Sequence, residues 1–352
     1  MKVNKIYYLL IIASFAIISA CDKEDKQVVT GISISKKSFL LTEGEIEGVW
    51  ITFEPNGSSD KVTWVSSDNE IATVSVSSYM PSKAKIKAIG PGHAVISALV
   101  GDLKTECSVS VAVVPKGAVD LGVIIQREDG SWYRLFWAES NLCESGLSSN
   151  PEDYGDYYSW GELVPHYTSL DPLTWRDGKS GYNWSSYKWG KDDKVIRYCP
   201  LDKQDKWGGS GNPDNKLEFK DYDYVDDAAR ATLGGNWRIP TEYEWRELER
   251  QCSVWMNTYS ETGVGGRVYK GKYGFSNTSI FLPAAGYWTY DGKHDVNVCG
   301  NYWTSSLYTE LSNSPVCAGS LHFSLEPQSL VPVARYNGFS VRPVTEGITE
   351  KP

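Results

Sequence analysis

The stretch VTWVSSDNEIATVSV, residues 62–76, shows how the first part of the chain folds. Apolar and polar residues alternate in residues 62–66 and again in residues 72–75, the period of strands with one buried face. Turn residues such as Pro55-Asn56-Gly57 and Gly90-Pro91-Gly92 separate such runs. Similar runs occupy residues 31–35, 49–53, 94–98 and 107–113. The pattern predicts an antiparallel β-sandwich over residues 28–113.

Three words in this segment also resemble a known family. VTWVSSD (62–68), IATV (71–74) and GHAVISA (92–98) are similar to the group 2 bacterial immunoglobulin-like family. The resemblance implies an immunoglobulin-like domain that acts as a mechanical spacer and holds the C-terminal part of the chain away from a cell surface.

The N-terminus has the pattern of an export signal. Lys2 and Lys5 precede an apolar run, and residues 1–20 end in small residues directly before Cys21. Ile18-Ser19-Ala20-Cys21 resembles a bacterial lipobox, which implies acylation of Cys21 and anchoring of the chain in a membrane. Residues 21–27 then form an acidic tether, similar to the signal that sends some lipoproteins to the exterior face of the outer membrane. We therefore expect an outer-membrane lipoprotein exposed to the cell exterior.

Length and charge narrow the function further. With 352 residues, the chain has room for two domains after the leader. A net charge of −9 repels phosphate backbones, so nucleic acid is not an expected partner. Most of the 14 Trp and 22 Tyr residues lie after residue 114, which marks the second domain as different in character.

Residues 119–347 predict a second domain of the α+β class with long loops. One helix is expected over residues 225–233, stopped by Gly234-Gly235. Another begins at Thr241, where Thr241 and Glu244 form a capping box. Strands are expected at residues 133–138, 280–284, 302–305, 320–324 and 339–341.

Several words in the second domain resemble the Fibrobacter-type major paralogous domain, a distant relative of the formylglycine-generating-enzyme branch of the C-type-lectin fold. They are VDLG (119–122), YGDYYSWGE (154–162), DDAAR (226–230), GGNWRIPT (234–241), FLPAAGY (281–287) and GFSVRPV (338–344). The resemblance implies that the first and last strands of the domain pair, and that a long loop region forms a ligand face.

Catalytic signatures are absent from the sequence. The formylglycine chemistry needs two cysteines four residues apart near the C-terminus, but Cys299 and Cys317 are eighteen apart. No nucleophile elbow, zinc motif or P-loop is present. We therefore expect a binding protein and not an enzyme. Two alternatives stay open: a carbohydrate-active or formylglycine-type enzyme with an unrecognised site, and a structural, pilus-tip or diversified receptor component.

Aromatic residues are the best candidates for ligand contacts, because Trp and Tyr stack on sugar faces and anchor interfaces. Two segments mix aromatic with small polar residues, as recognition loops do. The candidate binding residues are Trp184, Tyr187, Trp189, Tyr302, Trp303, Tyr308, His322, Arg335 and Tyr336. The expected ligand is an extracellular glycan or glycoprotein.

A cluster of acids gives a weaker candidate for a calcium site. Asp221, Asp223, Asp226 and Asp227 place four carboxylates within seven residues, and hard cations prefer such oxygen ligands. An EF-hand loop would require glycine and glutamate where Asp226 and Thr232 stand. We therefore expect no cofactor, with calcium as the alternative.

Overall fold

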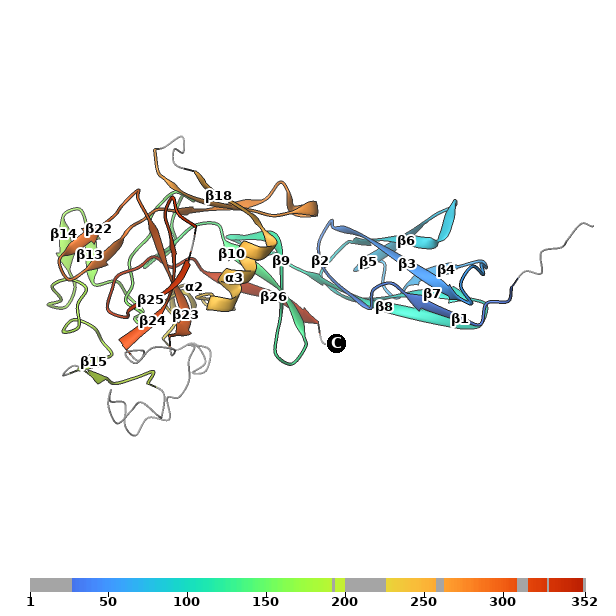
Figure 1. Ribbon diagram of the computed structural model, residues 1–352, viewed down its shortest axis with the longest axis horizontal. Helices are drawn as coiled ribbons and strands as arrows, with labels where there is room; N and C mark the ends of the chain where they lie inside the picture. Colours follow the sequence, from blue (N-terminus) through green and yellow to red (C-terminus); the bar gives the residue numbers. More distant parts are fainter. Residues whose placement is uncertain are drawn as a thin grey trace, which may run out of the picture.

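The computed structural model describes residues 27–191, 194–199, 226–257, 263–308, 316–327 and 329–350. The chain is mostly β-sheet, and its two domains lie one after the other along the long axis (Figure 1). The leader, Cys21, Asp221 and Asp223 lie outside the described residues. Within the described part, no helix is long and apolar enough to cross a membrane.

The first domain is a sandwich of two four-stranded sheets, as predicted. The sheet orders are β1-β3-β6-β5 and β2-β8-β7-β4. The strands are β1 Gly31–Ile34, β2 Ser38–Thr42, β3 Ile46–Glu54, β4 Thr63–Ser66, β5 Ala72–Ser77, β6 Met80–Ala88, β7 Gly92–Val100 and β8 Leu103–Ala112. All pairs are antiparallel except β2 with β8, which is parallel.

Alternation decides which face of each strand is buried. In β7, Ala94, Ile96, Ala98 and Val100 point into the core, and the residues between them do not. The buried residues of both sheets form one continuous cluster that stays within the first domain. The first domain therefore has its own hydrophobic core.

A four-stranded sheet, in the order β17-β26-β10-β9, supports the second domain. Its strands are β9 Ala118–Gln126, β10 Trp132–Ala138, β17 Trp237–Arg238 and β26 Val344–Glu350. The prediction that the first and last strands pair is wrong in detail. Both pair with β10, which lies between them: Trp137 is opposite Val119 on one side and Val344 on the other.

Two described helices pack beside this sheet. The predicted glycine stop of the first and the predicted capping box of the second are confirmed, but the first helix begins at residue 228 and not at 225. Helix α2, Ala228–Leu233, begins at residue 228 because the Asp227 side chain accepts a hydrogen bond from the Arg230 amide. Helix α3, Glu242–Gln251, has the full capping box between Thr241 and Glu244. Beneath α3, the Trp245 and Trp137 rings lie 4.5 Å apart in the core.

Two three-stranded sheets and four short hairpins make up the other strands of the described part of this domain. The sheets are β18 Ser253–Asn257, β19 Gly266–Lys270 and β20 Ser279–Pro283, and β23 Gly300–Leu307, β24 Cys317–Phe323 and β25 Ser329–Ala334. The hairpins are β11 Leu142–Cys143 with β12 Gly146–Leu147, β13 Tyr167–Leu170 with β14 Leu173–Trp175, β15 Gly190–Lys191 with β16 Lys194–Val195, and β21 Tyr287–Thr289 with β22 Gly292–His294. A 3-10 turn, η3, covers Tyr273–Phe275.

The predicted strand at residues 339–341 is not a strand of a sheet. Phe339 and Ser340 form single bridges with Tyr158 and Tyr302, because the segment passes between two different parts of the chain. The regular closing strand, β26, begins three residues later, at Val344.

A buried arginine joins the two domains. Arg134, in β10, donates to the carbonyl oxygen of Leu40 at 3.0 Å and to Glu45 Oε2 at 3.1 Å, both in the first domain. It also donates twice to Asp120, whose Oδ2 accepts a further hydrogen bond from Thr42 Oγ1 at 3.0 Å. The Arg134 side chain is only 3% exposed, so the charges at this junction are shielded from water. The two domains are therefore held by charged hydrogen bonds as well as by a short linker.

Candidate functional site

The structure places several of the predicted binding residues in the core. Tyr302 and Trp303 lie on β23, buried, and Trp303 Nε1 donates to the Tyr158 carbonyl at 2.6 Å. Arg335 is also buried, and its guanidinium donates to the carbonyl oxygens of Arg197 and Tyr198. These three side chains hold the fold together and offer no surface to a ligand. The described parts of residues 301–336, expected to be recognition loops, form the sheet β23-β24-β25 instead.

Two other predicted residues in this region are half-buried and lie apart from the core aromatics. His322 is on β24, where its Nδ1 lies 2.9 Å from Asn301 Oδ1. Burial holds the pKa of His322 below its usual value, which favours the neutral ring. Tyr308 follows the end of β23 and is partly exposed.

Four predicted residues do come together, and we call them the indole cluster: Trp184, Tyr187, Trp189 and Tyr336. The Trp184 ring lies 5.9 Å from Tyr187 and 6.2 Å from Tyr336. Trp184, Trp189 and Tyr336 are half-buried, whereas Tyr187 is buried beneath them. The cluster adjoins β15, at the end of the molecule that is remote from the first domain (Figure 1).

Backbone carbonyls of the YGDYYSWGE segment, residues 154–162, hold two side chains of the cluster in place. Tyr187 Oη donates to the Trp160 carbonyl at 2.7 Å, and Trp189 Nε1 donates to the next carbonyl, that of Gly161, at 2.8 Å. Gly190 lies directly against the Trp184 indole, where a Cβ would come within 3.0 Å of the ring. A side chain at residue 190 would therefore displace Trp184.

Two cations lie over the ring of Trp189. Lys188 Nζ is 4.1 Å from the ring centroid, and the Arg197 guanidinium is 5.2 Å away. Arg197 is held in place by Asp226 Oδ2, at 2.6 Å. The cluster therefore presents partly exposed aromatic rings beside positive charge, a combination that suits stacking and polar recognition.

The acidic residues of the predicted calcium cluster have structural partners where they are described. Asp226 accepts a hydrogen bond from Tyr198 Oη at 2.7 Å, besides its ion pair with Arg197. Asp227 caps α2 and accepts from the Ile239 amide at 2.8 Å. Burial raises the pKa of Asp227 to about 6. Among the described residues, no group of three or more acidic, histidine or cysteine side chains could hold a metal ion.

A buried polar group next to the indole cluster was missed by the sequence analysis. His166 Nε2 lies 3.0 Å from Glu162 Oε2 and 3.2 Å from Ser159 Oγ, and its Nδ1 lies 2.8 Å from the Gly181 carbonyl. Lys179 Nζ donates to the same Glu162 oxygen at 3.0 Å. The one available signal was the spacing of Glu162 and His166, four residues apart.

The composition of this group resembles a catalytic triad, but its geometry differs. A triad needs the serine at one imidazole nitrogen and the acid at the other. Here both Ser159 and Glu162 contact Nε2, and a carbonyl occupies Nδ1. Burial opposes ionisation of Glu162, but the hydrogen bond and charge of His166, with help from Lys179, hold its pKa below the usual value. The hydrogen bonds of His166 and Glu162 therefore link the loops that carry the indole cluster.

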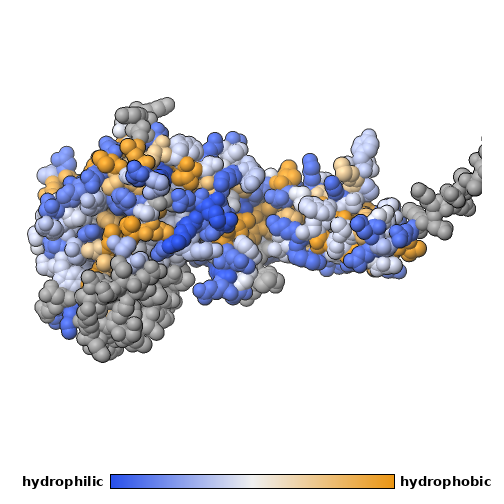
Figure 2. All heavy atoms as spheres, viewed as in Figure 1, coloured by the Kyte–Doolittle hydropathy of each residue, from blue (hydrophilic) through white to orange (hydrophobic). Residues whose placement is uncertain are grey.

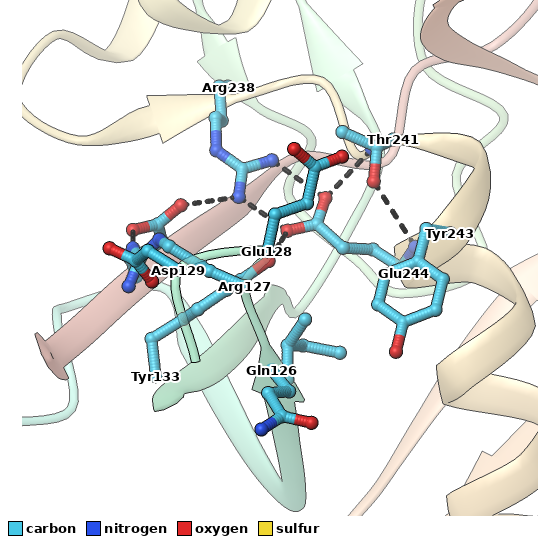
Figure 3. A pocket seen from close by; sticks show the side chains of 11 residues that line it. Gln126, Arg127, Glu128, Asp129, Tyr133, Arg238, Thr241, Tyr243 and Glu244 are labelled. Atoms are coloured by element: carbon cyan, nitrogen blue, oxygen red, sulfur yellow. Dashed lines mark hydrogen bonds and ion pairs between the residues drawn. The ribbon is translucent and has the colours of Figure 1, made fainter. Parts of the chain in front are cut away.

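A polar cavity of about 880 Å³ lies at the turn between β9 and β10 (Figure 3). One wall is a chain of ion pairs: Arg238 contacts both Glu244 and Glu346, and Arg127 contacts Glu346. Tyr133 Oη donates to Glu244 at 2.7 Å, so both oxygens of Glu244 have partners. Figure 3 shows Arg238 and Glu244 turned toward each other. Their hydrogen bonds are satisfied internally, so the wall stabilises the fold.

Comparisons with known proteins bear on the first domain. Residues 28–113 match the family described as the bacterial Ig-like domain (group 2). No curated protein matches the chain. Solved structures that are similar in part include S-layer protein SbsC domains 4 and 5, at 21% identity and a TM-score of 0.22, covering 24% of this chain and 52% of that chain. SbsC domains 5-6 match at 10% identity and a TM-score of 0.24, covering 87% and 97%. This chain thus spans about half of the first of these structures. On the family match and the two-sheet sandwich, residues 28–113 are a bacterial Ig-like domain of group 2.

Proposed function

We propose that this chain is a cell-surface lipoprotein whose second domain displays a non-catalytic, adhesin-like binding tip for an extracellular glycan or protein. The observation that carries the proposal is the order of the parts along the long axis of the molecule. The Ig-like domain begins at one end of the long axis, with β1, and the indole cluster lies near the other end (Figure 1). A spacer followed by a remote aromatic surface is the arrangement that a display protein needs.

The chemistry of the tip fits a sugar or a protein loop. Partly exposed indole faces stack on the apolar face of a sugar ring, and the same rings anchor protein interfaces. Lys188 and Arg197 add donors for hydroxyl or acidic groups. The resemblance of the second domain to the major paralogous and C-type-lectin-like families supports the same assignment, since their ligand face is built from long loops.

Absence of catalysis is also part of the proposal. The Ser159, His166 and Glu162 group is the strongest catalytic constellation among the described residues, and it is buried with both imidazole nitrogens engaged. A buried serine whose hydroxyl also donates to the Tyr336 carbonyl at 2.9 Å is not poised to attack a substrate. Calcium is not required by the proposed stacking contacts.

The anchor is tested by a Cys21→Ala variant of the full chain, because the cysteine thiol is the group that would be acylated. We expect wild-type protein to fractionate with membranes and to be cut by protease added to intact cells. The variant should be released from membranes. A variant that stays in the membrane fraction and resists protease on intact cells would overturn the anchor.

The proposed binding tip is tested by replacing its partly exposed rings, Trp184 and Trp189. We expect Trp184→Ala combined with Trp189→Ala to weaken ligand binding at least tenfold, since stacking by each ring contributes about 1 kcal/mol or more. Trp255→Ala is the matched control, because Trp255 is 46% exposed on β18, outside the cluster. Thermal unfolding of each variant separates lost binding from lost folding. Equal binding by the double variant and the control would remove the tip from the proposal.

A further inference from the structure

A groove of about 450 Å³ opens on the Ig-like domain beside the β5–β6 hairpin, and we call it the hairpin groove. It is lined by Gly48, Val49, Trp50, Ser75, Val76, Ser77, Met80, Lys83, Ala84 and Lys85. Its lining comes from β3, β5 and β6, neighbours in one sheet. The groove thus lies on a rigid element and belongs to no site described above.

Large apolar side chains are exposed around the groove. Trp50 is 48% exposed, Val76 43% and Met80 51%, and Tyr79 in the hairpin turn is 93% exposed. On this domain, as elsewhere, hydrophobic atoms reach the surface among hydrophilic ones (Figure 2). Grouped exposure of this kind, at a concave surface, marks an interaction site.

A row of lysines borders the apolar side chains. Lys83, Lys85 and Lys87 alternate along β6 and are all exposed. Their partners across β3 are Trp50, Gly48 and Ile46, none of which carries a charge. Within the described part of the chain, the three lysines form no ion pair. In a protein with a net charge of −9, this face is locally basic.

One end of the groove lies toward the tether. The turn of the β5–β6 hairpin and the start of β1 lie toward the end of the Ig-like domain that is remote from the second domain (Figure 1), whereas Lys87 pairs with Ile46, next to Glu45 of the domain junction. Gly31 follows Cys21 by ten residue steps, which span at most about 35 Å when the chain is fully extended. A membrane holding an acylated Cys21 is therefore within reach of this end.

We propose that the hairpin groove and the lysine row dock on the phosphate-bearing surface of an anionic lipid bilayer. The proposal rests on the proposed lipid anchor for its physiological setting. Lysines near a bilayer are attracted to anionic headgroups, and Trp, Tyr and Met side chains settle at headgroup depth. Such docking supplies a second membrane signal beside the acyl chains and fixes the angle at which the molecule leaves the membrane.

Charge favours a lipid surface over a second copy of this chain. Pairing two such faces through the same groove would bring two lysine rows together, and like charges oppose that contact. An anionic bilayer instead offers phosphates to every lysine at once, with an apolar layer directly beneath for Trp50 and Met80. The face therefore suits anionic lipid better than itself.

The test uses purified chain starting at Asp22, which carries all described residues and no lipid. Flotation with vesicles of phosphatidylcholine alone, or with about one third phosphatidylglycerol, measures binding independently of Cys21. We expect binding to the anionic vesicles only, lost at high salt. Lys83→Gln combined with Lys85→Gln should weaken it about 25-fold, since each lysine contributes about fivefold. Lys37→Gln combined with Lys61→Gln, exposed on the same domain, is the control and should leave it unchanged.

Several results would overturn this proposal. They are no binding to anionic vesicles, equal binding to phosphatidylcholine, or an equal loss in the control variant. Self-association that the Lys83 and Lys85 substitutions abolish would assign the face to a second copy instead. None of these results bears on the anchor. Because docking through the groove is lost at high salt, the anchor is overturned only if the Cys21→Ala variant stays membrane-bound after a high-salt wash.

Discussion

Replacing Arg134 by methionine is expected to destabilise the protein by about 3–5 kcal/mol and to loosen the two domains from each other. The substitution keeps an apolar stem but removes the charge that faces Asp120 and Glu45. Removing one partner of a buried ion pair leaves an uncompensated charge, which costs more than the pair itself contributes. The Leu40 carbonyl also loses its donor across the domain boundary.

Two measurements check this expectation. Denaturant unfolding gives the free energy, and trypsin cleavage at Lys116, an exposed residue of the linker, reports whether the domains have separated. Arg246→Met is the matched control, because Arg246 is 64% exposed and, among the described residues, forms its ion pair with Glu242 on the same helix. It should change stability by less than about 0.5 kcal/mol. An Arg134→Met variant as stable and as protected as this control would show that the junction is not held by the arginine.

Replacing Glu244 by glutamine is expected to cost about 3 kcal/mol at neutral pH. Glu244 is fully buried and accepts from Arg238, Tyr133 and the Thr241 amide. Glutamine has the same shape but no charge. Among the described residues, the buried guanidinium of Arg238 then keeps Glu346 as its carboxylate partner, and the new amide N–H₂ group faces other donors. The capping box of α3 is weakened by the same change.

This effect has a defined pH dependence. Burial raises the pKa of Glu244, but the charge and hydrogen bonds of Arg238 outweigh it and hold the pKa below the ordinary value of 4.5. A carboxyl with a lowered pKa stabilises the fold above its unfolded pKa and loses that contribution as the pH falls. The difference between wild type and variant should therefore be full above about pH 5 and shrink below about pH 4.5.

The control for Glu244 is on the same helix. Glu242→Gln removes a partly exposed carboxylate that pairs with the exposed Arg246, so we expect a change below about 1 kcal/mol. Urea unfolding of the three proteins between pH 3 and pH 8 provides the measurement. A Glu244→Gln variant that matches Glu242→Gln at neutral pH would contradict the role assigned to the buried pair.

Sequence patterns within single segments predicted the strands of the Ig-like domain and the ends of the helices. The alternation in residues 62–76 and the turn residues around it were enough to predict the Ig-like sandwich, because alternation is a property of each strand by itself. The strand pairs were less readable, since β4 pairs with β7, 30 or more residues further along the chain. The glycine stop of α2 and the capping box of α3 could also be predicted, because a cap depends on residues a few positions apart. The strand pairs of the second domain's sheet could not be predicted from such local patterns. Strand β26 pairs with β10 across about 200 residues, and the sequence of neither strand identifies its partner.

For the candidate site, too, the sequence showed the residue types but not which side chains are exposed. Trp189 and Trp303 both lie among polar residues, yet Trp189 is partly exposed and Trp303 is buried under Phe339, at 4.5 Å between rings. Exposure is set by tertiary packing, so composition alone could not separate them. The Arg134 junction was also invisible, because its acceptors include a backbone carbonyl 94 residues away.

The most direct test of the central claim is binding of purified chain, from Asp22 to Pro352, to a broad array of glycans and extracellular glycoproteins, first with calcium and then with chelator. We predict that the chain binds a specific ligand in the presence of chelator, and that this binding is lost when Trp184 and Trp189 are replaced by alanine but not when Trp255 is. A ligand lost on chelation would instead point to a metal site. Two results would contradict the claim that the aromatic tip binds the ligand: no binding to any member of the array, or unchanged binding by the double variant.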